Sequence, residues 1–295
     1  MSKATNLNMK YLFPIILLLL CMRSISLIAQ EYKIVTFNIR EDLKKDGLNC
    51  WKYRKHYLIP FLDKKSPDII CLQEARLNQT EDIGNRLINY GIVDIARNKR
   101  FTLKGTVPIL YRKDKFVVLN MGYFSLSEHP DSLGRIGWDA KYPRVAIWAN
   151  LKDLETGNIF FIINTHLDNS GKQARHNGIK QITDTIPKLS KCDNIILTGD
   201  FNSTEKSVVY KYVILHNLID SYRSCSRRNG VTYTYHNFGR RELSKRKKID
   251  FVFVSKNFDP LYVSIPQDRN TRGTYMSDHN PVITTLHYNG SVVGF

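Results

Sequence analysis

The chain has 295 residues and a hydrophobic content of 42%. This is enough apolar material for one large buried core, which argues against an intrinsically disordered chain. Its formal net charge is +17 at pH 7. Such a charge favours nucleic acid or an anionic membrane surface as a partner, although it also serves plain solubility. No Pro-rich, Gly-rich or low-complexity linker divides the sequence, so we expect one domain.

The first thirty residues predict a secretory signal peptide. They contain three basic residues and no acid, and the apolar run 12–22 is too short to span a bilayer comfortably. A basic start, a short apolar core and a polar stretch up to residues 29–30 are typical of export with cleavage there. A retained anchor is the alternative, because Arg23 directly follows the run. We expect a secreted or periplasmic protein whose domain 31–295 has a net charge of +14 (17 − 3) and is not stably inserted in a membrane.

Apolar runs and helical spacing predict an alternation of strands and helices. We expect strands at 33–39, 69–73, 107–111, 144–151, 159–165, 194–198, 249–254 and 282–287. We expect helices at 51–63, 81–89, 172–186 and 205–216. Most of the strands are continuous apolar runs, which is typical of strands covered on both faces. The pattern therefore predicts an α/β layered fold in which two packed sheets carry helices on their outer faces.

Two oxygen-bearing side chains end neighbouring predicted strands. Asn38 closes the first strand and Glu74 closes the second. Taken singly, Asn38 reads as a turn former and Glu74 as a solvated acid. Held together at adjacent strand ends, an amide oxygen and a carboxylate suit a hard cation such as Mg²⁺. We expect both residues to be metal ligands.

A second group of polar side chains follows the strands 159–165 and 194–198. His166 ends the first of them, and a lone histidine there is by default a satisfied core residue. Asp200 and Asn202 alternate after the second strand and point the same way if the strand continues. Asp200 is suited to orient an attacking water, and Asn202 to contact phosphate or metal. The alternative for Asn202 alone is an Asx turn that caps the next helix.

The last group lies near the C-terminal end of the sequence. Asp250 stands where a basic segment enters the apolar strand 249–254, and Asp278 and His279 precede Pro281. An aspartate bonded to one ring nitrogen fixes the histidine tautomer and raises the basicity of the other nitrogen. We expect Asp250 and His279 to form a water-activating pair and Asp278 to hold metal. Hydrolysis of a phosphodiester needs these elements together.

Basic residues crowd the segment 223–248 around a single acid, Glu242. They are Arg223, Arg227, Arg228, Arg240, Arg241, Lys245, Arg246, Lys247 and Lys248. Aromatic residues lie among them, and such a mixture stacks bases while the cations hold phosphates. A solvated surface loop is the alternative.

Cysteine usage adds little about function. Four cysteines follow the predicted signal, and Cys71 lies within an apolar run, where a core position is expected. An exported chain is able to pair the other three. No metal knuckle is present.

Six ordered motifs resemble those of the endonuclease/exonuclease/phosphatase superfamily, the DNase I-like proteins. They are TFNIR (36–40), CLQE (71–74), NTHLD (164–168), TGDFN (198–202), IDFVFVS (249–255) and SDHNP (277–281). The resemblance implies a four-layer α/β sandwich, in which two packed mixed β-sheets are flanked by helices and the site lies at the rim between the sheets. Arg40 stands where abasic-site endonucleases tend to carry an acid, which argues against that repair specificity.

The resemblance also implies roles for individual residues. It assigns metal and phosphate contacts to Asn38, Glu74, Asp200, Asn202 and Asp278, a phosphate contact to His166, and the orientation of His279 to Asp250. The segment 109–146 is similar to an uncharacterised bacterial branch that is usually exported. That similarity implies substrate-phosphate contacts for Tyr111, Arg144 and Arg175.

Three functions are compatible with these patterns. The first is a Mg²⁺- or Mn²⁺-dependent phosphodiester hydrolase, a nuclease that acts as an endonuclease or 3′-exonuclease. The second is a phosphoesterase for a lipid headgroup or a small phosphorylated molecule, which a basic pocket serves equally. The third is a catalytically silent nucleic-acid-binding module. The complete set of acids and histidines argues against the third function, because phosphate binding alone needs only lysine and arginine.

Overall fold

The computed structural model describes residues 30–95, 105–267, 269 and 273–290. Contacts within the chain divide it into residues 1–30 and 31–295, and the fold concerns the second unit alone. The predicted signal peptide lies outside the described residues, apart from Gln30.

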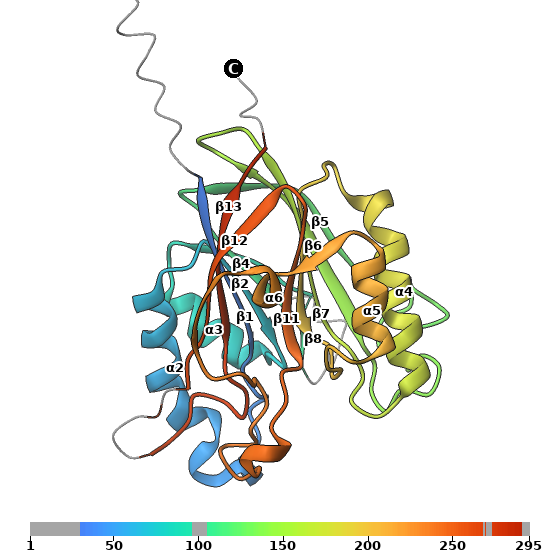
Figure 1. Cartoon of the computed structure of the whole chain (residues 1–295). Coiled ribbons are helices and arrows are strands. Elements are labelled where there is room, and N and C mark those ends of the chain that lie inside the picture. Colours follow the sequence, from blue (N-terminus) through green and yellow to red (C-terminus); the bar gives the residue numbers. More distant parts are fainter. Residues whose placement is uncertain (1–29, 96–104, 268, 270–272, 291–295) are drawn as a thin grey trace, which may run out of the picture. The chain divides into compact units, whose positions relative to one another are not determined.

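Two mixed β-sheets form the centre of the unit (Figure 1). The first sheet has the strand order β10-β12-β13-β1-β2-β4-β3. Its strands are β1 (Glu31–Asn38), β2 (Ile69–Gln73), β3 (Tyr90–Val93), β4 (Ile109–Arg112), β10 (Arg227–Gly230), β12 (Phe258–Ile265) and β13 (Val282–Tyr288). The second has the order β5-β6-β7-β8-β11-β9. Its strands are β5 (Phe116–Ser125), β6 (Val145–Asp153), β7 (Ile159–His166), β8 (Ile195–Asp200), β9 (Leu218–Asp220) and β11 (Asp250–Ser255).

Helices cover the outer face of each sheet. These are α2 (Trp51–Lys65) and α3 (Leu77–Arg86) on the first sheet, and α4 (Lys172–Leu189) and α5 (Val208–Leu215) on the second (Figure 1). The short elements are η1 (Lys44–Asn49), α6 (Ser221–Ser224) and η2 (Leu243–Lys245). The layer order is therefore helix, sheet, sheet, helix, as expected from the motifs.

Three apolar clusters hold the layers together. The central cluster joins the facing sides of the two sheets, with residues such as Ile34 of β1 and Ile162 of β7 fully buried. A second cluster packs α4 and α5 on the six-stranded sheet, and a third packs α2 and α3 on the seven-stranded sheet. Strands such as β2 and β8 are buried along their whole length, which explains their continuous apolar sequences.

All eight predicted strands are present within about two residues of their expected bounds. The helices differ more. Helix α3 begins at Leu77 because the Gln79 side chain accepts a hydrogen bond from the Arg76 amide. Helix α5 begins at Val208 because Ser207 caps it by accepting a hydrogen bond from the Tyr210 amide.

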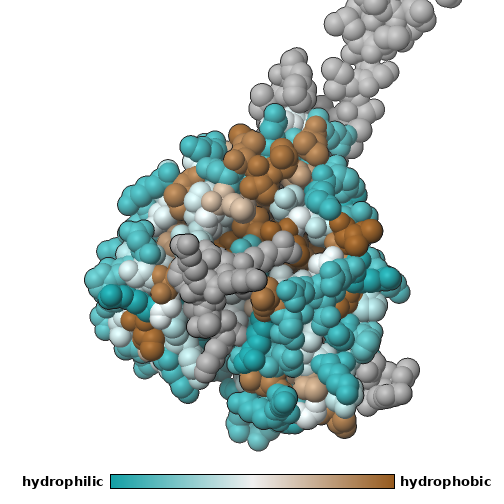
Figure 2. Space-filling view, turned by 180° about the vertical axis from the view of Figure 1, so that it is seen from behind, coloured by the Kyte–Doolittle hydropathy of each residue, from teal (hydrophilic) through white to brown (hydrophobic). Residues whose placement is uncertain are grey.

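Strand β5 was not predicted, and its surface explains why. It is an edge strand that pairs only with β6. Partly buried and exposed positions alternate along most of it, so its sequence lacks the continuous apolar run of a buried strand. Its exposed large hydrophobic side chains are Val117, Leu119, Met121 and Tyr123. Figure 2 shows that apolar side chains also gather on the rear face of the molecule.

The four described cysteines, Cys50, Cys71, Cys192 and Cys225, are free thiols. Cys71 is fully buried in the central cluster, which confirms its expected core position. No pair among these four forms a disulfide.

Parallel pairing brings the predicted site residues to one edge. β1 is parallel to β2, and β7 is parallel to β8. Asn38 is therefore level with Gln73, just before Glu74, and His166 is level with Asp200. β11 runs antiparallel to β8, which places Asp250 opposite Asp200. Polar side chains from both sheets thus meet at their rim.

Candidate active site

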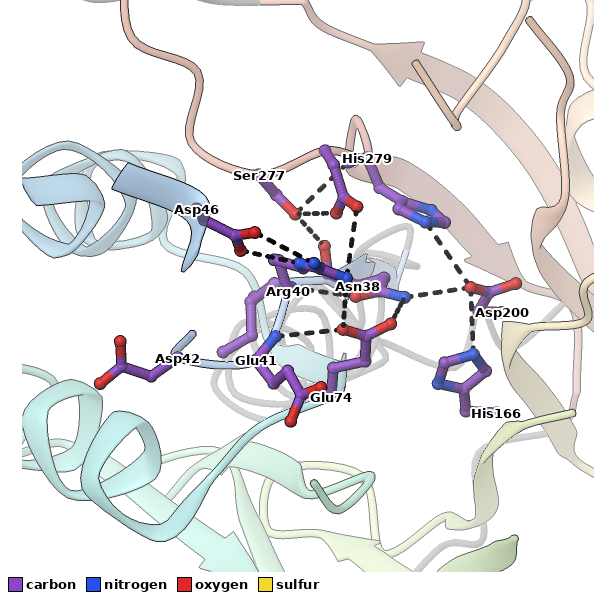
Figure 3. Close-up of polar contacts among 12 residues, drawn as sticks. Asn38, Arg40, Glu41, Asp42, Asp46, Glu74, His166, Asp200, Ser277 and His279 are labelled. Carbon is purple, nitrogen blue, oxygen red and sulfur yellow. Dashed lines mark hydrogen bonds and ion pairs between the residues drawn. The ribbon is translucent and has the colours of Figure 1, made fainter. Parts of the chain in front are cut away.

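Asn38 links the two sheets at the rim. Its side chain is fully buried, and its amide nitrogen donates to Glu74 Oε1 at 3.1 Å and to Asp200 Oδ2 at 3.0 Å (Figure 3). Its amide oxygen accepts from the Arg40 backbone amide at 3.0 Å. In this structure Asn38 therefore orients two carboxylates that come from different sheets.

The backbone turns sharply where these strands end. Glu74 and Asn202 have positive φ angles of 59° and 45°, which direct their side chains out of the strand path toward the rim. Gly199 has a φ of 149°, and a Cβ there would lie 2.2 Å from the Thr165 carbonyl oxygen. Only glycine fits this close approach of β8 to β7.

His279 and Asp250 form the expected pair. Nδ1 of His279 lies 2.9 Å from Asp250 Oδ2, and both side chains are buried. Burial alone would lower the pKa of His279, but the Asp250 carboxylate, assisted by Asp200 and Asp278, raises it to about 10. Because Nδ1 faces Asp250, the Nε2 atom is directed to Asp200 Oδ2 at 3.7 Å.

Asp200 lies at the centre of the site. Its Oδ2 atom is 3.4 Å from His166 Nε2, and its Oδ1 atom accepts from the Asn202 amide at 2.8 Å. Burial, followed by repulsion from Asp250, raises the pKa of Asp200 to about 7. Burial lowers the pKa of His166 well below its usual value, with a further contribution from the Arg144 cation. Asp200 thus lies between one imidazole whose pKa is lowered and another whose pKa is raised.

The Asn202 side chain forms hydrogen bonds at the end of β7, so it does more than cap a turn. Its Nδ2 atom lies 3.0 Å from His166 Nε2 and donates to the Leu167 carbonyl at 2.9 Å. The structure therefore places Asn202 beside His166, in the expected cluster.

Asp278 enters the site through a short loop before β13. Ser277 Oγ donates to the Asn38 carbonyl at 2.7 Å and lies 3.3 Å from Asp278 Oδ1. Burial raises the pKa of Asp278. Arg40 Nη1 lies 3.9 Å from both Asp278 Oδ2 and Glu74 Oε2. Sequence reasoning assigned no role in the site to Arg40 or Ser277.

The donor set fits a divalent cation. Glu74, Asp200 and Asp278 offer carboxylate oxygens, which Mg²⁺ and Mn²⁺ prefer. The raised pKa values of Asp200 and Asp278 mark carboxylates that burial has deprived of solvent, and a cation compensates for that loss. Among the described residues, the ligand atoms that lie within 4.8 Å of one another belong to a different group, Asp200, Asp250 and His279. We favour the first set, because Asp250 and His279 are already bonded to each other.

Asp168 joins both expected substrate arginines. Its Oδ2 atom is 3.4 Å from Arg144 Nε, and its carbonyl accepts from Arg175 Nη1 at 2.8 Å. Its Oδ1 atom accepts from the Ser170 and Gly171 amides at 2.9 and 2.8 Å. Asp168 follows His166 by two residues, so the arginines belong to the site edge. The quoted NTHLD motif contained this aspartate, but its role depends on contacts that the motif does not reveal.

Tyr111 lies away from this cluster. It pairs with Ile69 at the start of β2, whereas Glu74 follows the end of that strand, about 16 Å further along at roughly 3.3 Å per residue. A Cβ on Gly91 would meet the Tyr111 ring at 2.2 Å. This placement does not support the expected contact between Tyr111 and substrate phosphate, because the β4 strand runs away from the rim.

Much of the basic segment serves the fold. Lys248 pairs with buried Asp220 at 3.0 Å, Arg246 stacks on Tyr233, and Arg241 lies over Tyr235. The Tyr235 ring in turn lies 5.0 Å from the His279 ring. Exposed cations remain at Arg223, Arg227, Arg228, Arg240, Lys245 and Lys247.

A model of the endonuclease/exonuclease/phosphatase family matches residues 35–279. The chain belongs to the endonuclease/exonuclease/phosphatase family. Its members hydrolyse phosphoric esters, and this match includes every residue of the rim cluster.

Solved structures of this family share the fold. An endonuclease/exonuclease/phosphatase from Bacteroides vulgatus is 36% identical, with a TM-score of 0.83 over 88% of this chain and 99% of that one. A mannosyl-6-phosphatase from Bacteroides thetaiotaomicron is 29% identical, with a TM-score of 0.80 over 87% of this chain and 100% of that one.

Among curated proteins, the chain is 26% identical to Protein angel of Drosophila melanogaster over 62% of this chain and 56% of that protein. It is 25% identical to a probable CCR4-Not complex 3′-5′-exoribonuclease subunit of Enterocytozoon bieneusi over 85% of this chain and 63% of that protein. The chain thus spans about three fifths of the length of these relatives.

Proposed function

We propose that the protein is a Mg²⁺- or Mn²⁺-dependent hydrolase of phosphate esters whose preferred substrate is a small phosphorylated molecule, such as a sugar phosphate. The observation that carries the substrate class is the similarity to the mannosyl-6-phosphatase, which covers the whole of that chain at 29% identity. The commitment of Lys248, Arg246 and Arg241 to internal contacts also supports it, because it reduces the surface available to a polymer.

The side chains divide the reaction between them. Glu74, Asp200 and Asp278 would hold the cation, which would neutralise phosphate charge. Asp250 fixes His279 so that Nε2 faces Asp200. In its neutral form, His279 presents Nε2 to accept a proton from the attacking water.

The other side of Asp200 serves the phosphate. His166 and Asn202 lie together there, and Arg144 is held nearby by Asp168. The His166 imidazole and the Arg144 guanidinium are donors suited to phosphate oxygens, and Asn202, whose Nδ2 atom already donates to the Leu167 carbonyl, positions His166. They would stabilise the charge that develops on these oxygens during displacement.

The test is phosphate release by the purified protein with Mg²⁺, Mn²⁺ or EDTA. The substrates are mannose 6-phosphate, glucose 6-phosphate, a chromogenic phosphodiester, sphingomyelin, a phosphoinositide, single-stranded DNA and RNA. We expect metal-dependent turnover of a sugar phosphate that His279→Ala abolishes. Turnover of the lipids alone would show that the substrate is a lipid headgroup. Absence of turnover with every substrate would refute the proposed enzymatic activity.

A nuclease is the second candidate. The net charge of +14 in 31–295 and the exposed cations of the basic segment support it. The curated relatives include a probable 3′-5′-exoribonuclease subunit. Metal-dependent cleavage of DNA or RNA that exceeds sugar phosphate turnover would favour this candidate.

We also propose that the chain is exported. The support is the basic and apolar pattern of residues 1–30. Among the described residues, no helix is long and apolar enough to cross a membrane. N-terminal sequencing of the protein from a fractionated host tests the proposal. A new terminus near residue 30 outside the cytoplasm supports it, and an intact Met1 in the cytoplasm contradicts it.

A further inference from the structure

Arg40 is held in an unusual backbone conformation directly after β1. Its φ angle is 56°, in the left-handed region that non-glycine residues seldom adopt. Three hydrogen bonds fix it there. Its amide donates to Asn38 Oδ1 at 3.0 Å, and its carbonyl accepts from Arg54 Nη2 and Gln79 Nε2, each at 2.9 Å. The direction of the side chain is therefore set by the fold.

The guanidinium is clamped on one side and faces the site on the other. Asp46 accepts from Nε at 2.9 Å and from Nη2 at 3.1 Å. The remaining nitrogen, Nη1, lies 3.9 Å from Glu74 Oε2 and 3.9 Å from Asp278 Oδ2 (Figure 3). The bidentate clamp keeps this charge at the two carboxylates.

Glu74 and Asp278 come from distant parts of the chain and converge on this cation. Both are among the oxygen donors that fit a divalent ion. A guanidinium and a divalent ion that share two carboxylates repel each other. Each also neutralises part of the negative charge that would attract the other. The two hydrogen bonds to Asp46 oppose a movement of the Arg40 guanidinium away from these carboxylates.

We propose that Arg40 is a built-in counter-ion of the metal site, which limits the site to one divalent ion, weakens the binding of that ion, and stabilises the fold when no ion is bound. The inference rests on the metal dependence within the proposed function. It concerns ion binding and stability, so it is measurable without any substrate.

The first experiment is a Mn²⁺ titration of the EDTA-treated, dialysed full chain, followed by the electron paramagnetic resonance of free Mn²⁺. We expect one Mn²⁺ per wild-type chain. Arg40→Gln should bind its first ion about tenfold more tightly or take up a second ion. Arg86→Gln is the matched control, because it removes one positive charge from an exposed ion pair with Asp63 outside the carboxylate cluster, and it should behave as wild type.

The second experiment compares thermal unfolding with and without Mn²⁺. Arg40→Gln should lower the melting temperature of the metal-free protein, and saturating Mn²⁺ should close most of that gap. Arg86→Gln should show no such metal-dependent gap. If Arg40→Gln does not fold, Asp46→Asn replaces it, because it loosens the clamp and leaves the metal donors intact. A smaller increase in Mn²⁺ affinity is then expected.

Unchanged or weaker Mn²⁺ binding by Arg40→Gln, with unchanged stoichiometry, would overturn the inference. Absence of Mn²⁺ binding in both wild type and variant would overturn it as well. Tighter binding by the variant in a protein that hydrolyses none of the substrates would uphold the counter-ion and refute the proposed function.

Discussion

Asp250 Oδ2 and His279 Nδ1 are bonded at 2.9 Å, although Asp250 begins β11 of the six-stranded sheet and His279 precedes β13 of the seven-stranded sheet. The other carboxylate oxygen, Asp250 Oδ1, is buried and has no hydrogen-bond partner among the described residues. A buried carboxylate with one bonded oxygen depends strongly on that single partner. We therefore expect the pair to act as a unit in stability and in the proposed catalysis.

The first prediction concerns turnover. His279→Ala and Asp250→Asn should each lower kcat by roughly 10²–10⁴-fold, because general acid–base groups contribute that much. The double variant should be little worse than either single variant, since the residues act together. Steady-state kinetics with saturating Mg²⁺ checks this, with circular dichroism as the control for folding. Additive losses would show that the two residues act separately.

The second prediction concerns the pH dependence of stability. The pKa of His279 is raised from 6.5 to about 10, so the folded chain holds a proton that the unfolded chain releases. This contribution to the free energy of unfolding is fully present below pH 6.5 and is lost as pH rises through about 10. Urea unfolding of metal-free protein should show the difference between wild type and His279→Gln shrinking across this range. A constant difference would contradict it.

The third prediction concerns the arginines at the edge of the site. Asp168→Asn removes the carboxylate that faces Arg144 at 3.4 Å. We expect KM for the phosphate ester to rise about tenfold with a smaller change in kcat, because one positioned ion pair is worth roughly that much. Asp139→Asn is the control, since Asp139 accepts hydrogen bonds from the first turn of α4 and does not contact Arg144. Equal kinetics for both variants would remove the positioning role.

The fourth prediction concerns Arg54, which is fully buried in α2. It donates to the carbonyls of Asn49, Ile39, Met276 and Arg40 at 2.6–2.9 Å. Arg54→Met should lower the free energy of unfolding by at least about 3 kcal/mol, because several buried carbonyls lose their donor. Arg86→Met, at an exposed pair with Asp63, should cost less than about 1 kcal/mol. Denaturant titration compares them, and similar losses would refute the role of Arg54.

The fifth prediction separates two neighbouring lysines. Lys248 is paired with Asp220 and nearly buried, so Lys248→Met should cost about 3–5 kcal/mol of stability by leaving that carboxylate unpaired. Lys247 is exposed, and Lys247→Met should change stability by less than about 0.5 kcal/mol. If the substrate is a polyanion, Lys247→Met should also reduce the salt slope of binding by about one. Equal stability of both variants would contradict the assignment.

The sequence predicted the elements that have simple environments. Strands such as β2 and β8 are buried on both faces, and their apolar runs carry that information locally. Strands β5 and β12 lie nearer the sheet edges or contain a bulge, so their patterns are mixed. Helix starts depended on single caps such as Ser207, which composition alone does not select.

The site was predicted where a polar residue ends an apolar strand. Asn38, Glu74, His166 and Asp200 follow that rule, because a buried polar group needs a partner. The contacts of Arg40 and Asp168 did not follow from it. They depend on side chains far away in the chain, such as the Asp278 that Arg40 faces. The substrate contact of Tyr111 came from the resemblance alone and stays a prediction, although strand direction places Tyr111 opposite Ile69, away from the rim.

Gly199 couples the architecture of the sheet to its chemistry. Any side chain there would press on the Thr165 carbonyl and push β8 away from β7. Those two strands carry Asp200 and His166 at their ends. A substitution at a position with no functional group would therefore disassemble the reaction centre by widening one strand pair. We therefore expect a related protein with another residue at this position to have lost the hydrolytic activity.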